Sequence, residues 1–229
     1  MKKKAIGILG GMGPESTALF YSELIKQCQK QYGAQYDEDY PEIFIYSLPI
    51  PDIVRGIKRS DTTREMMTNG IKKIEKIGSQ IITMPCNSAE YFYDDIKKKT
   101  TVPFFSMIEK TAQRANANNY KNVGLLATET TLDNKLYENI FSKYAINIIK
   151  PSNQKTVTDI ICNILAGNKS QKDKEEIIKI IEQLKTDGAD AVILGCTDLP
   201  ILINQIDTKI PLLNTVKILA EATIKYSIK

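Results

Sequence analysis

Short apolar runs rich in β-branched residues alternate along the chain with longer segments in which apolar residues recur at helical spacing, such as residues 16–32 and 175–188. Most of the short runs are apolar at consecutive positions, which is typical of strands that are buried on both faces of a parallel sheet. Strands alternating with helices predict an α/β fold with mostly parallel sheets flanked by helices. The predicted strands are residues 4–9, 42–48, 79–84, 102–107, 122–127, 146–150, 190–195 and 211–214.

One stretch of this pattern occurs twice. Residues 71–90 align with residues 181–200 at an offset of 110 positions, and the alignment places Cys86 on Cys196. Each copy consists of a helical segment, a glycine stop, a buried strand, a cysteine and then polar residues before another helix. The shared glycine and cysteine favour two related half-chains over the chance likeness of unrelated strand–helix units.

A weaker match of residues 5–15 with residues 122–132 occurs in the same order along the chain, with a similar offset. Together the two matches predict two similar α/β domains, related by a pseudo-twofold axis, with a cleft between them. We expect the first domain to contain residues 1–106 and 211–229, and the second to contain residues 107–210.

Composition excludes several classes of function. The chain has 229 residues, 42% of them hydrophobic and 25% charged, and a formal net charge of +4. The lysines that carry this charge are scattered along helical segments rather than gathered in a stripe with aromatic residues, so we expect no nucleic-acid partner. No stretch approaches the roughly 20 apolar residues that cross a bilayer, and the apolar run near the start is too short for a signal peptide. We therefore expect no membrane partner and a cytoplasmic location.

The cysteines provide the candidate chemistry. The four cysteines lie far apart without a CxxC pair, and the chain contains no histidine, so neither a zinc site nor a disulfide framework is expected. Cys28 and Cys162 lie in helical patterns and are interpreted as small buried hydrophobic residues. Cys86 and Cys196 instead follow buried strands, at the carboxyl ends where parallel sheets bind ligands.

If the two halves face each other, Cys86 and Cys196 enter one cleft from opposite sides. A helix N-terminus lowers the pKa of a thiol, so each cysteine could act as a thiolate. Such a pair could be a redox couple, or two bases acting on opposite faces of one carbon. The second scheme fits inversion at the Cα atom of an amino acid, because one thiolate removes the proton while the opposite thiol delivers another.

Small polar residues beside the two thiols complete the predicted site. Asn87, Ser88, Thr197 and Asp198 supply hydrogen-bonding groups around the sulfur atoms. The glycine-rich turn after the first strand allows backbone N–H groups to approach a carboxylate closely. A turn between residues 128 and 131 either contacts the substrate or only caps the helix that follows. The substrate-binding residues predicted on these grounds are Gly11, Met12, Asn87, Ser88, Thr128, Thr131, Thr197 and Asp198.

Four segments resemble the aspartate/glutamate racemase superfamily, and within it the aspartate racemases most closely: residues 6–21, 84–90, 124–131 and 188–200. The resemblance implies an isomerase that is independent of pyridoxal phosphate, with no cofactor and no metal. It also implies that two cysteines act as the acid and base in a cleft between two similar α/β domains, and that the protein is a homodimer. On this basis Cys86 and Cys196 are the two catalytic bases that convert L-aspartate to D-aspartate.

The sequence departs from the family pattern at several positions. Glu90 stands where family members commonly have histidine, and Asp198 where they have glutamate. Aspartate racemases often carry Arg and Lys at the positions of Ile53 and Leu165. Arg55 is the replacement expected to bind the side-chain carboxylate, because a guanidinium pairs with a carboxylate through two hydrogen bonds. Lys169 is the second candidate for this role.

Other functions remain open at this point. A glutamate racemase or a racemase of broad range would use the same residues. An isomerase or decarboxylase of dicarboxylic acids could be built on the same fold. A sensor that binds an amino acid without turnover is the alternative outside enzymology, although a sensor has no need of two matched thiols.

Overall fold

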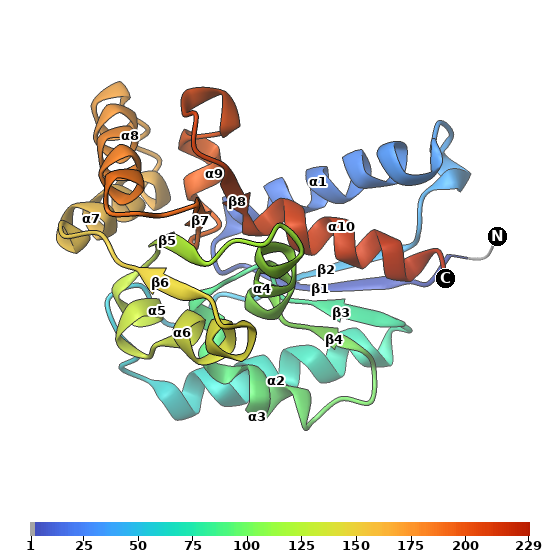
Figure 1. Ribbon diagram of the computed structural model, residues 1–229. Coiled ribbons are helices and arrows are strands. Elements are labelled where there is room, and N and C mark those ends of the chain that lie inside the picture. The colour runs from blue at the N-terminus through green and yellow to red at the C-terminus, as the bar shows by residue number, and fades with distance from the viewer. Residues whose placement is uncertain (1–2) are drawn as a thin grey trace.

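The computed structural model describes residues 3–229 as two four-stranded parallel sheets with helices packed on them (Figure 1). The elements of the first half are β1 (Ile6–Gly10), α1 (Pro14–Tyr32), η1 (Asp37–Asp39), β2 (Ile43–Ser47), α2 (Ser60–Lys76), β3 (Ile81–Thr83), η2 (Ser88–Phe92), α3 (Tyr93–Lys97) and β4 (Phe104–Phe105). Those of the second half are α4 (Met107–Ala117), β5 (Asn122–Leu126), α5 (Glu129–Asp133), α6 (Leu136–Phe141), η3 (Ser142–Tyr144), β6 (Asn147–Ile149), α7 (Gln154–Leu165), α8 (Gln171–Thr186), β7 (Ala191–Leu194), α9 (Leu199–Leu202), η4 (Gln205–Asp207), β8 (Leu212–Asn214) and α10 (Thr215–Ser227). No helix within residues 3–229 is long and apolar enough to cross a membrane.

The predicted α/β class is confirmed, and all eight strands lie at the predicted runs, with only β1 extending one residue past its run. The strand orders are β2-β1-β3-β4 in the first sheet and β6-β5-β7-β8 in the second. These two orders have the same topology, as the internal repeat predicts. Because every pair of neighbouring strands is parallel, each connection crosses over through a helix, and both sheet faces are covered.

The register of the strands reproduces the sequence alignment of the two halves. Gly7 on β1 is opposite Ile82 on β3, and Gly124 on β5 is opposite Val192 on β7. The two sequence alignments place Gly7 on Gly124 and Ile82 on Val192. A Cβ atom on Gly7 would lie 2.1 Å from Cγ2 of Ile74 on α2. Helix α2 can therefore pack this closely against β1 only because residue 7 is a glycine.

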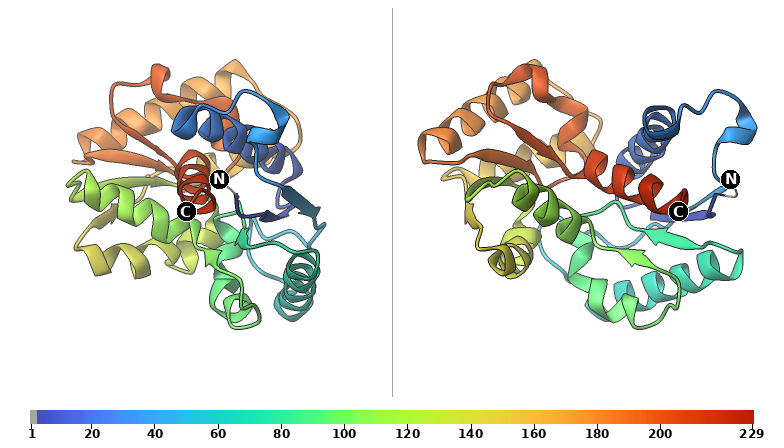
Figure 2. Two further views of the ribbon diagram at one scale, coloured as in Figure 1. Left: turned by 90° about the vertical axis from the view of Figure 1, so that its right-hand side faces the viewer. Right: turned by 45° about the vertical axis from the view of Figure 1, so that its right-hand side comes forward.

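The last two elements join the halves. β8 pairs with β7 in the second sheet, whereas the predicted domain limits assign residues 211–229 to the first domain. The helix that follows, α10, packs against both α1 of the first half and α4 of the second (Figure 2). Sheet membership therefore corrects the predicted boundary at β8, because the alternation of strand and helix does not show which sheet an edge strand joins.

Candidate active site

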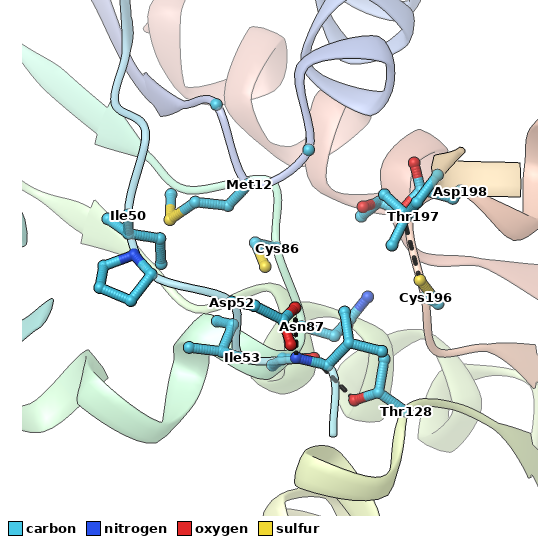
Figure 3. Close-up of a pocket in the computed structure, with 16 residues that line it drawn as sticks. Met12, Ile50, Asp52, Ile53, Cys86, Asn87, Thr128, Cys196, Thr197 and Asp198 are labelled. Carbon is cyan, nitrogen blue, oxygen red and sulfur yellow. Dashed lines mark hydrogen bonds between the residues drawn. The ribbon is translucent and has the colours of Figure 1, made fainter. Parts of the chain in front are cut away.

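A pocket lies between the two halves (Figure 3). Most of its lining residues follow the carboxyl ends of β1, β2, β3, β5 and β7. Its volume is about 160 Å³, roughly ten times what one water needs, which suits a ligand of the size of an amino acid. The residues that line it are Gly11, Met12, Gly13, Ile50, Pro51, Asp52, Ile53, Val54, Cys86, Asn87, Ser88, Thr128, Leu165, Cys196, Thr197 and Asp198. Both strand-end cysteines are therefore part of one pocket.

Cys86 reaches the pocket because β3 ends at Thr83 and the chain turns immediately. The Cys86 N–H donates to the carbonyl of Met84 at 2.8 Å, and η2 starts two residues later. The backbone N–H groups of Ser88 and Ala89 approach the sulfur. Cys86 is 7% exposed and is one of the residues that line the pocket.

Cys196 occupies the equivalent position after β7. Gly195 precedes it and donates its N–H to the carbonyl of Leu126 at 2.7 Å, which fixes the end of the strand against β5. The Sγ–H group of Cys196 donates to Oδ2 of Asp198 at 3.5 Å. Cys196 is 8% exposed, and it faces the pocket from the opposite side to Cys86 (Figure 3).

Both thiols have raised pKa values in the pocket. Burial is the largest cause at each, and it raises the pKa of Cys86 to about 12 and that of Cys196 well above its usual value. The negative charge of Asp198 raises both further, and backbone N–H groups lower them only in part. The expectation that helix N-termini lower these pKa values is thus wrong, because the elements after the cysteines are short and burial outweighs their N–H groups.

Asp198 is itself perturbed. Burial raises the pKa of its carboxyl to about 6, and the hydrogen bond from Cys196 opposes this shift. The charge of Glu15 raises the same pKa while that of Lys169 lowers it. Near neutral pH, a carboxylate therefore stands beside the Cys196 thiol and accepts its hydrogen bond.

Asn87 is held by side chains of the second half. The Tyr137 hydroxyl donates to Oδ1 of Asn87 at 2.7 Å, and Nδ2 of Asn87 donates to Oγ1 of Thr215 at 3.2 Å. Both partners are fully buried. The amide is thereby fixed in one orientation beside Cys86.

Three hydroxyl groups form a second connection between the halves. Oγ of Ser88 lies 2.8 Å from Oγ1 of Thr128 and 3.2 Å from Oγ1 of Thr131. The two threonine Oγ1 atoms are 3.0 Å apart. Thr128 also caps α5 by accepting the N–H of Thr131. Ser88 and Thr128 line the pocket, whereas Thr131 lies behind them. Thr131 is therefore placed to orient the hydroxyl groups that line the pocket.

The loop after β2 forms one wall of the pocket, with Ile50 to Val54 among the lining residues. The next residues anchor it to the second half. The Gly56 N–H donates to Oγ1 of Thr130 at 2.8 Å, and the Arg55 guanidinium pairs with Asp159 at 2.6 Å and with Glu129 at 3.7 Å. Arg55 is not among the lining residues, and its charge is already paired outside the pocket, contrary to its predicted role as the carboxylate receptor.

Seven of the nine predicted substrate-binding residues line the pocket: Gly11, Met12, Asn87, Ser88, Thr128, Thr197 and Asp198. The sequence does not predict most of the loop wall, which is formed by Ile50, Pro51, Asp52 and Val54. Ile53 and Leu165 stand out in the sequence only as departures from the family pattern. The position of this loop after a predicted strand was the available signal, since the carboxyl ends of parallel strands share one edge.

Glu90 does not line the pocket. Its carboxyl accepts the Ser106 hydroxyl at 2.5 Å and the Met107 N–H at 2.7 Å, at the N-terminus of α4. Burial raises its pKa to about 8, although these two hydrogen bonds lower it. Glu90 therefore connects the first half to the first helix of the second.

The chain resembles known proteins along almost its whole length. The profile of a family described as Asp/Glu/Hydantoin racemase matches residues 9–223. The broad specificity amino-acid racemase RacX of Bacillus subtilis is 32% identical over 220 residues, which are 96% of this chain and 96% of that protein. The structure of Picrophilus torridus aspartate racemase superposes with a TM-score of 0.84 at 31% identity, covering 99% of this chain and 95% of that one. An aspartate racemase homologue from Pyrococcus horikoshii gives a TM-score of 0.83 at 29% identity, covering 100% of both chains.

Proposed function

We propose that this chain, which belongs to the Asp/Glu/hydantoin racemase family, inverts the Cα configuration of its substrate by proton transfer between Cys86 and Cys196. Family membership makes the chain an amino-acid racemase. The observation that supports the assignment of the bases is that both thiols, from equivalent points of the two halves, line one pocket. Base catalysis on opposite faces of one carbon requires two groups arranged in this way.

The proposed reaction conserves protons and needs no cofactor. The thiolate of one cysteine takes the proton from Cα, and the electron pair of the broken C–H bond is delocalised into the α-carboxylate. The thiol of the other cysteine then gives its proton to the opposite face of Cα and becomes a thiolate. The enzyme thus ends with its proton on the other sulfur, and the reverse reaction uses the two thiols in exchanged roles.

The charges of the pocket indicate how a thiolate could form in it. Burial disfavours a thiolate at either cysteine. The ammonium group of an amino acid brings a positive charge between Cys86, Cys196 and Asp198, and a nearby opposite charge favours an ionised thiol. Cys86 is the better site for the first thiolate, because two backbone N–H groups approach its sulfur whereas Cys196 donates to a carboxylate.

The similarity to relatives supports two alternative substrate ranges for the proposed racemase. Aspartate as the substrate is supported by the sequence motifs and by the likeness to the Picrophilus torridus aspartate racemase. A broader range is supported by the likeness to RacX, whose name describes broad specificity.

The test is exchange and racemisation in heavy water. Purified protein is incubated in D₂O, without added cofactor, with each of several L-amino acids, and loss of the Cα proton is followed by NMR while chiral chromatography follows the D-isomer. We expect both signals from at least one amino acid, and a loss of racemisation of at least about 10³-fold in Cys86→Ser and in Cys196→Ser. Cys162→Ser is the matched control, since Cys162 lies on α7 outside the pocket lining and should leave the rate unchanged.

The outcomes separate the alternatives. Full racemisation in either Cys86→Ser or Cys196→Ser would show that the two-base assignment is wrong. Tight binding without Cα exchange for any amino acid would instead indicate a sensor.

A further inference from the structure

The pocket is lined by both polar and apolar side chains. The polar groups gather around the two sulfurs and can bind the ammonium and carboxylate that every amino acid shares: Asn87, Ser88, Thr128, Thr197 and Asp198. The apolar side chains of the lining, called the apolar wall below, are those of Met12, Ile50, Ile53, Val54 and Leu165. If the polar groups bind the ammonium and the α-carboxylate, we expect the side chain that distinguishes one amino acid from another to contact the apolar wall.

The charge of the lining is entirely negative. Within residues 3–229, the side chains that line the pocket include the carboxyl groups of Asp52 and Asp198 but no lysine or arginine. Asp52 lies at the exposed edge and accepts the Val54 N–H at 3.1 Å, within its own loop. A substrate with a second carboxylate would bring a further negative charge into this lining without a cation to receive it.

Two cations that lie close to the pocket are already paired. Lys169 forms an ion pair with Glu15 across the two halves, and both charges act on Asp198. Arg55 pairs with Asp159 and Glu129. Moving either cation into the pocket would break an existing ion pair and leave its carboxylate partner without that attraction.

Ile53 and Leu165 close the apolar wall from the two halves of the molecule. Ile53 is 6% exposed in the loop after β2, and Leu165 ends α7 at 43% exposure, next to Gly13. On these grounds we propose that the site selects amino acids whose side chains carry no carboxylate, with Ile53 and Leu165 as the residues that exclude acidic side chains. This inference rests on the proposed racemase function and replaces aspartate as the preferred substrate.

The physical basis is the difference between the two kinds of side chain. A methionine or leucine side chain gains from the removal of its apolar surface from water against these residues. The carboxylate of aspartate loses its hydration there and meets no lysine or arginine side chain of the lining. We expect the kcat/KM of the best non-acidic substrate to exceed that of aspartate by at least about 10²-fold.

The first experiment measures racemisation of L-methionine, L-leucine, L-lysine, L-aspartate and L-glutamate by the wild-type protein in D₂O. Faster turnover of at least one of the three non-acidic substrates than of both acidic ones supports the proposal. Faster turnover of aspartate or glutamate than of all three overturns it, while leaving the two-base function intact. Absence of Cα exchange in all five would instead count against the proposed function itself.

The second experiment places a cation in the apolar wall. Leu165→Lys is the first variant, because a half-exposed position accommodates a charged head group without loss of core packing. The double variant Ile53→Arg with Leu165→Lys adds a guanidinium from the opposite side. We expect the ratio of kcat/KM for aspartate over methionine to rise at least about tenfold in the single variant and further in the double.

The control for these variants is Ile206→Lys, which adds the same charge at an 89% exposed position outside the pocket lining and should leave the ratio unchanged. An unchanged ratio in a folded Leu165→Lys variant would overturn the role of this residue. Since Ile53 is buried, the double variant counts only if its circular dichroism matches the wild type, and the single variant keeps the test decisive if the double variant fails to fold.

Discussion

Replacing Glu90 by glutamine should change how the stability of the protein depends on pH. The carboxyl group is buried between the two halves, and burial raises its pKa from 4.5 to about 8. Between these two values the native state holds a proton that the unfolded chain releases, so the free energy of unfolding falls as pH rises. The stability that protonated Glu90 gives is complete below about pH 4.5 and is lost as pH rises through about 8.

The magnitude follows from the size of the shift. Each pKa unit corresponds to about 1.4 kcal/mol, so the shift from 4.5 to about 8 makes the loss across this range on the order of 3–5 kcal/mol. Glutamine is neutral at every pH and keeps a carbonyl that can accept the Met107 N–H. Glu90→Gln should therefore match the wild type within about 1 kcal/mol at pH 5 and be more stable by a few kcal/mol at pH 8 to 9.

The assay is urea unfolding at each pH from 5 to 9, followed by circular dichroism, with the m-value compared between the two proteins. Ser106→Ala is the companion variant, since the Ser106 hydroxyl donates to Glu90 and lowers its pKa. Removing this donor should move the pH-dependent loss to higher pH, in addition to a pH-independent cost of about 1 kcal/mol for the lost cap of α4. Parallel stability curves for wild type and Glu90→Gln would refute the reasoning, as would a wild type that gains stability relative to the variant as pH rises.

Three further substitutions test the site. Gly11→Ala should cost about 2–4 kcal/mol in urea unfolding and lower racemase activity, because Gly11 has a φ of +91° and a Cβ atom there would lie 2.5 Å from backbone. Tyr137→Phe should cost about 0.5–1.5 kcal/mol and reduce kcat/KM about 3- to 10-fold, because it removes the hydrogen bond that fixes Asn87. In Asp198→Asn the pKa of Cys196 should fall, because the carboxylate charge that raises it is gone. Alkylation of Cys196 by iodoacetamide at pH 8, followed by mass spectrometry, should then be about tenfold faster for each pKa unit lost.

Each of these three predictions has a result that would contradict it, and the first also has a control variant. Gly33→Ala is the control for Gly11→Ala: Gly33 also has a positive φ, of 72°, but a Cβ atom added there would meet nothing within 4 Å, so only about 1–2 kcal/mol should be lost. Equal costs at both glycines would contradict the steric argument. For Tyr137→Phe, a fall in stability without any change in kcat/KM would contradict the role given to Asn87. For Asp198→Asn, alkylation of Cys196 at the wild-type rate would show that the carboxylate does not control this thiol.

The sequence alone determined the fold class and the pair of cysteines. The strands could be predicted because parallel strands that are buried on both faces leave runs of consecutive apolar residues, and eight such runs became β1 to β8. The repeat of a cysteine after the strand in residues 71–90 and 181–200 indicated that Cys86 and Cys196 act together. Both signals can be read directly from the order of residues along the chain, so neither needs knowledge of the tertiary structure.

Only the tertiary structure decided the direction of the pKa shifts at the two thiols and which side chains form the apolar wall of the pocket. A helix that follows a cysteine predicts a lowered thiol pKa, but the depth of burial determines the sign of the shift and depends on contacts between the two halves. In the same way Arg55 lies two residues from Ile53 in the chain, yet the fold pairs Arg55 with Asp159 on α7 and turns Ile53 into the pocket. Desolvation and charge pairing are properties of residues that are distant in sequence and close in space, and the order of residues along the chain does not specify them.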